Sequence, residues 1–168
     1  TAQQRLAALL KKGRLSRTAK SPRALWVTGP LRAFCPDGTI AVPLVGRIAA
    51  GSPIFALEDA EEVLPLPSAL FHGNDLFALR VKGDSMINAG IFDGDIAILR
   101  PGPDFSDGDI AAVVLEEEAT LKRVFKTKRG LRLQAEHPAY PDRLIASEQM
   151  RQSFRLAGVL VGTIRRFP

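Results

Sequence analysis

The sequence predicts a mainly β protein: a compact β-rich domain over residues 42–168, preceded by a partial winged helix-turn-helix over residues 1–28. Short apolar or alternating runs recur from residue 42 onward, and turns such as Phe92–Asp95 and Ser106–Asp109 separate them, which is typical of β-sheet domains. The first residues instead combine helical spacing with basic charge. With 168 residues, 46% of them hydrophobic, the chain is long enough to bury a core.

Residues Ala2–Lys12 are predicted to form a helix, because apolar residues recur at spacings of three and four, and Gly13 follows where a left-handed residue is favoured. The outward face of this helix carries Gln3, Gln4 and Arg5. After it, Leu15–Arg17 and Ala24–Val27 are predicted as two strands joined by the basic tip Lys20–Arg23.

This first segment is too small to fold alone, because one helix and a hairpin bury too little apolar surface to offset their ordering entropy. We therefore expect further helices ahead of Thr1. The arrangement resembles the second half of a winged helix-turn-helix, with the helix as the recognition helix and the hairpin as the wing.

The charge of the chain is strongly asymmetric. Residues 1–36 carry eight basic and no acidic residues, which leaves 15 basic and 18 acidic residues, a net charge of −3, for the remainder. A basic block of this kind favours a polyanion partner, most often nucleic acid. We expect Lys20 and Arg23 to contact DNA phosphates, Gln3 and Gln4 to read base edges in the major groove, and Arg5 to lie beside them.

Residues 29–41 are predicted to be a linker, because Pro30, Pro36 and Gly38 interrupt a stretch without periodicity. The second domain then holds seven predicted strands. They are Val42–Ala49, Leu76–Lys82, Asp95–Leu99, Ile110–Leu115, Thr120–Phe125, Leu131–Gln134 and Leu156–Ile164.

A serine and a lysine form the candidate catalytic pair. Ser85 lies in the turn Gly83–Met86, and Lys122 follows 37 residues later in a predicted strand. Serine is a weak nucleophile until a base accepts its proton, and lysine serves as that base only when its amine is uncharged. Burial against apolar neighbours is the usual means of lowering a lysine pKa, so we expect Lys122 to be partly desolvated.

The turn at Ser85 also offers backbone donors, since the N–H groups of Ser85 and Met86 are candidates for stabilising the oxyanion formed during attack on a carbonyl. The candidate substrate is the bond between Ala50 and Gly51, where small side chains allow a close approach and Pro53 disfavours helix. We expect the segment after Met86 to form a short helical turn.

These elements in this order resemble the family of self-cleaving Ser-Lys peptidases that includes the SOS repressor LexA, the polymerase accessory protein UmuD and lambda-type phage repressors. The matching segments are Val45–Gly51, Val81–Met86, Gly90–Asp95, Ala119–Arg123 and Val159–Gly162. The resemblance implies that Ser85 is the nucleophile, Lys122 the general base and Ala50–Gly51 the scissile bond. It also implies a β-rich domain that dimerises through its C-terminal strands, near Phe154–Ile164, and cleavage that is stimulated by a RecA filament on single-stranded DNA.

Among the relatives, a LexA-type SOS repressor is favoured, because the basic winged-helix segment ahead of the linker is typical of it, whereas UmuD lacks such a segment. As a dimer it would bind a palindromic operator. A UmuD-like translesion polymerase subunit is the alternative, since Gly83–Met86 is closer to the UmuD pattern. A leader peptidase and a noncatalytic β domain fit less well.

Other classes of site find little support in the sequence. The single cysteine excludes an internal disulfide, and we expect no metal and no organic cofactor. No run of about 18 apolar residues or signal peptide is present, so we expect no membrane partner and a cytoplasmic location.

Overall fold

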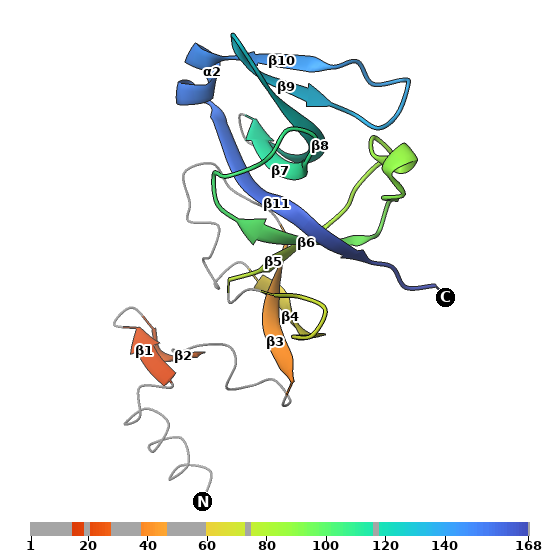
Figure 1. Cartoon of the computed structure of the whole chain (residues 1–168). Coiled ribbons are helices and arrows are strands. Elements are labelled where there is room, and N and C mark those ends of the chain that lie inside the picture. Colours follow the sequence, from red (N-terminus) through yellow and green to blue (C-terminus); the bar gives the residue numbers. More distant parts are fainter. Residues whose placement is uncertain are drawn as a thin grey trace, which may run out of the picture.

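The computed structural model describes residues 15–18, 21–27, 38–46, 60–72, 75–115 and 118–167. Within these ranges, β1 (Leu15–Thr18) and β2 (Ser21–Val27) form an antiparallel hairpin, and nine further strands form one large sheet (Figure 1). The strands of the large sheet are β3 (Thr39–Val45), β4 (Ala60–Pro67), β5 (Phe77–Arg80), β6 (Ile96–Pro101), β7 (Ile110–Leu115), β8 (Glu118–Thr127), β9 (Gly130–Gln134), β10 (Arg143–Ala146) and β11 (Phe154–Ile164). Two short helices, η3 (Ile87–Ala89) and α2 (Ser147–Gln152), complete the described elements. The predicted mainly β fold is confirmed.

The large sheet has the order β10-β9-β8-β7-β11-β6-β5-β3-β4. Its neighbours are antiparallel except for the parallel pair β3 and β5. Strands β7 to β10 follow one another as a meander, and β11 returns to lie between β7 and β6 (Figure 1). The first half of β11 pairs with β7 and its second half with β6, so this last strand joins the two halves of the sheet.

Three apolar clusters form the core along the sheet. One lies under β3 to β6 around Val42 and Ile98, and another under β7 to β10 around Val113 and Leu133. The third, between them, contains Met86, Leu121 and their neighbours. Because β8 contributes Leu121 to one cluster and Val124 to another, both of its faces are partly covered. Alternation alone therefore does not decide which face of this strand is buried.

Each predicted strand overlaps an observed one, and the predicted helical turn after Met86 is observed as η3. Strands β4 and β10 and helix α2 were not predicted. The observed β3 begins at Thr39, inside the range 29–41 expected to be linker, because Ile40 already packs into the core with 4% exposure.

The hairpin tip is shorter than expected, since Ser21–Arg23 belong to β2 rather than to the turn. A register shift next to Thr18 explains how Pro22 is accommodated, because a bulge does not require its missing N–H. The predicted helix Ala2–Lys12 lies outside the described residues. Nowhere in the described ranges is there a helix with the length and apolar character needed to cross a bilayer.

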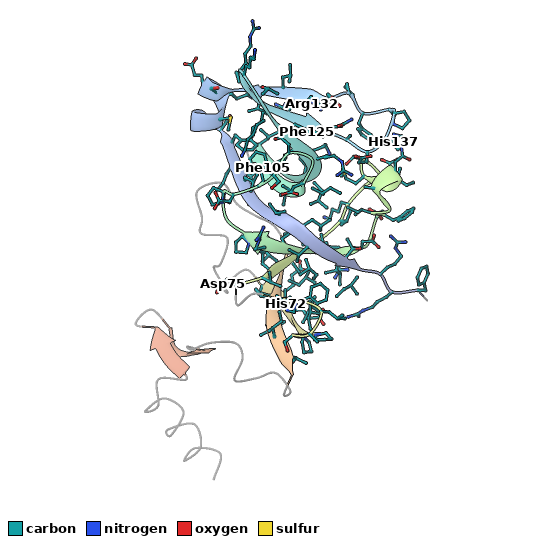
Figure 2. All side chains as sticks on the ribbon, in the orientation of Figure 1. His72, Asp75, Phe105, Phe125, Arg132 and His137 are labelled. Atoms are coloured by element: carbon teal, nitrogen blue, oxygen red, sulfur yellow. The ribbon has the colours of Figure 1, made fainter. Side chains whose placement is uncertain are left out.

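Side chains fill the space over the strands, as Figure 2 shows. At the β8–β9 pair, Phe125 lies opposite Arg132, and the guanidinium carbon is 4.3 Å from the ring centroid (Figure 2). Contacts of this kind keep the meander ordered on its solvent side.

Candidate active site

The turn that carries Ser85 connects β5 to η3. Its first residue, Gly83, has a φ of +80°, a conformation that favours glycine. Its last residue, Met86, is 2% exposed and packs in the central core cluster. The turn is thus anchored on both sides of Ser85, which is itself partly exposed. We call residues 83–86, which carry the candidate nucleophile, the nucleophile turn.

A second turn, Phe92–Asp95, holds the nucleophile turn from the side. The Gly83 N–H donates to Asp93 Oδ1 at 2.7 Å. The N–H of Gly94 donates to the carbonyl of Val81 at 3.0 Å, and the N–H of Val81 donates to the carbonyl of Asp95 at 2.8 Å. The two turns, which residues 87–91 separate in the sequence, therefore form one hydrogen-bonded unit.

Asp95 anchors this unit in the interior with a carboxylate that is 1% exposed. Arg165 donates to both of its oxygens, from Nε to Oδ1 and from Nη2 to Oδ2, each at 2.7 Å. The hydrogen bonds from Arg165 lower the pKa of Asp95, against the opposing effect of burial. Arg165 also stacks on Phe92, with the guanidinium carbon 4.1 Å from the ring centroid.

Lys122 projects from β8 toward the nucleophile turn. Its Nζ lies 2.9 Å from Ser85 Oγ, 3.0 Å from Thr120 Oγ1 and 2.9 Å from the carbonyl oxygen of Leu121. Burial lowers the pKa of the Lys122 amine. The flanking Leu121 packs in the same core cluster as Met86, so buried neighbours of Ser85 and of Lys122 fix the two side chains against each other.

The three oxygens around Lys122 Nζ suit either protonation state of the amine. A charged ammonium donates to all three. A neutral amine has two N–H donors and one lone pair; when the N–H groups donate to Thr120 Oγ1 and the Leu121 carbonyl, the lone pair is left to accept the proton of the Ser85 hydroxyl, at a distance suited to proton transfer.

Comparison with known proteins assigns the chain, rather than its site geometry, to a family. A family model described as Peptidase S24-like matches residues 43–161. The LexA repressor of Caldicellulosiruptor saccharolyticus is 39% identical over 161 residues, which cover 96% of this chain and 76% of that protein. The LexA repressor of Desulforamulus reducens is 37% identical over 152 residues, covering 90% of this chain and 68% of that protein.

The chain belongs to the LexA repressor family. The expected resemblance is thereby confirmed, together with the prediction of an SOS repressor that carries a self-cleaving serine peptidase domain. The peptidase match begins inside β3, the first strand of the large sheet in sequence, and ends inside β11, its last.

Sequence reasoning missed one loop of this LexA-family chain, residues 135–140 between β9 and β10, which we call the brace loop. The N–H of Glu136 donates to the carbonyl of Ser85 at 2.8 Å, and the N–H of Asn88 donates to the carbonyl of Glu136 at 2.9 Å. Tyr140 donates its hydroxyl proton to Asp84 Oδ1 at 2.6 Å, which lowers the pKa of Asp84. Sequence reasoning could not detect these contacts, because hydrogen bonds between residues about 50 positions apart leave no periodic pattern in the sequence.

The structure describes some of the other predicted site residues and not others. The N–H groups of Ser85 and Met86 have no hydrogen-bond acceptor among the described residues. Ala50 and Gly51, and on the DNA side Gln3, Gln4, Arg5 and Lys20, lie outside the described residues. Arg23 lies in β2, where only the backbone is described. In the described part of the chain, no three His, Cys, Asp or Glu side chains are grouped to hold a metal.

Proposed function

We propose that Ser85 and Lys122 are the nucleophile and the general base of self-cleavage, and that the bond cut is Ala50–Gly51. The observation that carries the proposal is the 2.9 Å separation of Ser85 Oγ and Lys122 Nζ, together with a Lys122 pKa lowered by burial. A lysine with a lowered pKa is uncharged in a larger share of molecules at neutral pH, and the uncharged share is the one able to act as a base.

The reaction proceeds in two stages. Lys122 Nζ accepts the Ser85 proton while Oγ attacks the Ala50 carbonyl carbon, and the protonated amine then delivers that proton to the departing Gly51 nitrogen. Residues 1–50 are now an ester on Ser85. A water molecule, deprotonated by Lys122, hydrolyses this ester and restores the hydroxyl. Thr120 Oγ1 and the Leu121 carbonyl hold the amine in place throughout.

The oxyanion of the tetrahedral intermediate is assigned to the backbone N–H groups of Ser85 and Met86. Their freedom from other acceptors among the described residues supports this role. Preorganised donors of this kind stabilise charge that appears only during the reaction.

As a repressor, the protein is proposed to bind operator DNA through residues 1–28. Lys20, Arg23 and Arg5 supply positive charge, and Gln3 and Gln4 read base edges. Cleavage after Ala50 separates this basic segment from residues 51–168. We assign the stimulation of cleavage to a RecA filament on single-stranded DNA, which favours the conformer with the cleavage segment docked on Ser85.

Dimerisation is assigned to the second half of β11. Residues Leu160–Ile164 pair with β6 on one side, while the pairing with β7 ends at Val159, so no described strand occupies their other edge. Val161 lies in this stretch and is 44% exposed. An unpaired edge with exposed apolar side chains is suited to a two-fold contact with a second copy.

The experiment is a mass measurement of the full chain during incubation at about pH 10, where an unperturbed lysine is already partly neutral. We expect fragments 1–50 and 51–168. Ser85→Ala should reduce the rate at least about 1,000-fold and Lys122→Ala at least about 100-fold. Circular dichroism should show both variants folded. Cutting by a folded Ser85→Ala at the rate of the parent chain would remove Ser85 from its role.

A further inference from the structure

We propose that the ion pair between Arg123 and Glu136 is a positioning device that sets the distance between Ser85 and Lys122. This inference rests on the proposed function of that dyad. The pair does not touch the reacting atoms. It connects the strand that carries the base to the loop that holds the nucleophile.

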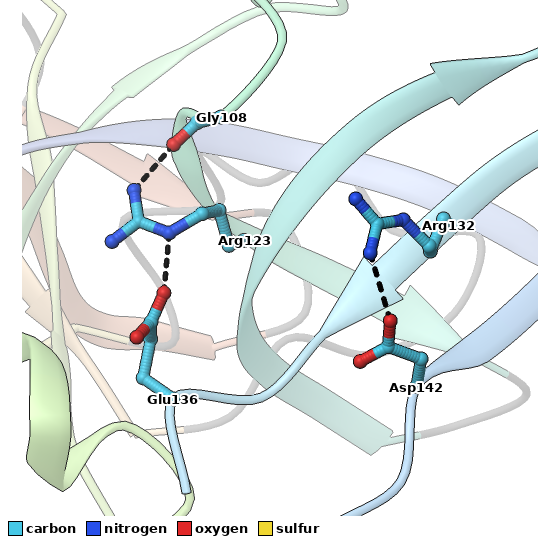
Figure 3. A network of polar contacts seen from close by, with 5 residues as sticks. All are labelled: Gly108, Arg123, Arg132, Glu136 and Asp142. Carbon is cyan, nitrogen blue, oxygen red and sulfur yellow. Dashed lines mark hydrogen bonds and ion pairs between the residues drawn. The ribbon is translucent and has the colours of Figure 1, made fainter.

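The four residues form a closed ring of contacts. Ser85 Oγ lies 2.9 Å from Lys122 Nζ, and Lys122 is followed in the chain by Arg123. Arg123 Nε donates to Glu136 Oε1 (Figure 3). The backbone N–H of Glu136 donates to the carbonyl of Ser85 at 2.8 Å. Because the ring returns to Ser85, a shift in any link changes the separation of hydroxyl and amine.

Glu136 holds the nucleophile side of the ring at two points. Its N–H binds the carbonyl of Ser85 and its carbonyl accepts the N–H of Asn88 in the following helical turn, at 2.9 Å. The backbone of one residue therefore binds both ends of the segment 85–88. The contact of the Glu136 side chain with Arg123 sets the position of this segment relative to β8.

Arg123 is itself oriented by a second acceptor. Its Nη1 donates to the carbonyl of Gly108 (Figure 3). The N–H of Gly108 donates in turn to the carbonyl of Val124 at 2.9 Å. The planar guanidinium is thus fixed in two directions, which a flexible lysine amine does not match. The side chains of Arg123 and Glu136 are 30% and 24% exposed. Water therefore screens the attraction between their charges less than it does in a fully exposed ion pair.

The pair acts on position rather than on the acidity of the base. Burial lowers the pKa of Lys122, and the partners of its amine are Ser85, Thr120 and Leu121 rather than Glu136 or Arg123. Loss of the pair should therefore leave the pH midpoint of cleavage in place and reduce the maximal rate, since a displacement of about 1 Å at a reacting pair can cost on the order of 100-fold.

Arg132 and Asp142 provide the matched control. They form a neighbouring ion pair at 2.9 Å, with 36% and 40% exposure (Figure 3). Among the described residues, Asp142 has no hydrogen bond or ion pair to the nucleophile turn. Asp142→Ala removes the same kind of carboxylate from the same part of the fold, and it leaves the stacking of Arg132 on Phe125 available.

The test measures cleavage rate against pH in the full chain for Glu136→Ala, Glu136→Gln, Arg123→Gln, the double variant Arg123→Gln/Glu136→Gln and Asp142→Ala. We expect Glu136→Ala to lower the plateau rate about 10- to 100-fold with an unchanged midpoint. Glu136→Gln, which keeps an acceptor for Arg123, should retain more activity, and it serves as the test if the alanine variant fails to fold. The double variant should be little worse than Arg123→Gln alone, because the two residues act through one contact.

Two results would overturn the inference: equal plateau rates for the folded Glu136 variants and Asp142→Ala, or a moved midpoint at an unchanged plateau. Ser85→Ala, measured alongside, separates this inference from the proposed function. If Ser85→Ala stops cleavage while the Glu136 variants cleave at the rate of Asp142→Ala, the proposed function of the dyad is supported and the positioning role of Glu136 is refuted.

Discussion

The backbone N–H of Gly83 donates a hydrogen bond to Asp93 at 2.7 Å, and this contact joins the two turn motifs that stand out most in the sequence. Gly83 has a φ of +80°, and Gly38, remote from Ser85, has a φ of +77°; a Cβ at either position would meet no atom within 4 Å. The two glycines therefore differ in location and not in the strain that a side chain would cause.

Gly83→Ala and Gly38→Ala should each cost about 1–2 kcal/mol of stability, the usual penalty for a left-handed non-glycine residue. Gly83→Ala should also slow self-cleavage about 10-fold or more, because relaxation of the strain moves Ser85. Denaturant unfolding and fragment yield measure the two effects. Equal cleavage by both variants would show that the conformation of Gly83 does not position the nucleophile.

Self-cleavage should rise with pH as Lys122 loses its proton. Burial lowers its pKa from the ordinary 10.5, so the midpoint of the rate profile should lie below 10.5. Thr120→Val removes one acceptor that holds the amine and should lower the rate at every pH. The measurement is the rate of fragment appearance in buffers from neutral to alkaline pH, and a midpoint at or above 10.5 would contradict a desolvated base.

Replacing the base by an apolar side chain should stabilise the fold at neutral pH. In the unfolded chain Lys122 titrates near 10.5, and in the folded chain its pKa is lower, so the native state binds fewer protons between the two values and wild-type stability rises with pH there. Lys122→Met removes the free-energy cost of burying a charged amine at neutral pH. Its melting temperature should exceed that of the parent by a few degrees at pH 7, with the gap narrowing toward pH 10.5; a less stable methionine variant would argue against it.

The strands that the sequence failed to predict are the two edges of the large sheet. The order begins with β10 and ends with β4. Edge strands tolerate prolines and charges because one row of their backbone groups needs no partner, and β4 contains Pro65 and Pro67 as well as two glutamates. Central strands such as β7 are buried on both faces and keep the unbroken apolar pattern that made them predictable.

The same contrast holds for the candidate site. Ser85 and Lys122 could be singled out as candidates because a nucleophile and its base must be one of a few residue types, and the structure places the two side chains 2.9 Å apart. Glu136 contacts the nucleophile turn through its backbone N–H, a group that almost every residue type has, and its side chain binds Arg123, 13 residues earlier in the sequence. Neither contact requires a recognisable sequence motif. Such supporting contacts depend on how the β9–β10 loop folds back over the nucleophile turn, and folding back of this kind has no signature in the local sequence.

Acid stability should depend on Asp95. Because Arg165 lowers its pKa below the ordinary 3.8, the ionised carboxylate contributes stability above about pH 3.8, and this contribution is lost as the pH falls through the lower folded value. Asp95→Asn should melt several degrees below wild type at pH 7, and the gap should shrink below pH 3.8. Asp142→Asn, at an exposed ion pair, should differ little from wild type at either pH. An Asp95→Asn gap that stayed constant on acidification would refute the linkage.

A charge at Val161 should weaken the proposed dimer without unfolding the monomer. Val161 lies at a register shift between Leu160 and Gly162, so its replacement leaves the pairing of β11 with β6 in place, and its 44% exposure leaves room for a longer side chain. In a two-fold contact each copy would bring the same residue, so Val161→Glu places two like charges at one interface. Sedimentation analysis should show a dissociation constant raised at least about 10-fold. Val63→Glu, on the edge strand β4 and 38% exposed, is the control. If both variants dimerise like the parent chain, the contact lies elsewhere on the domain.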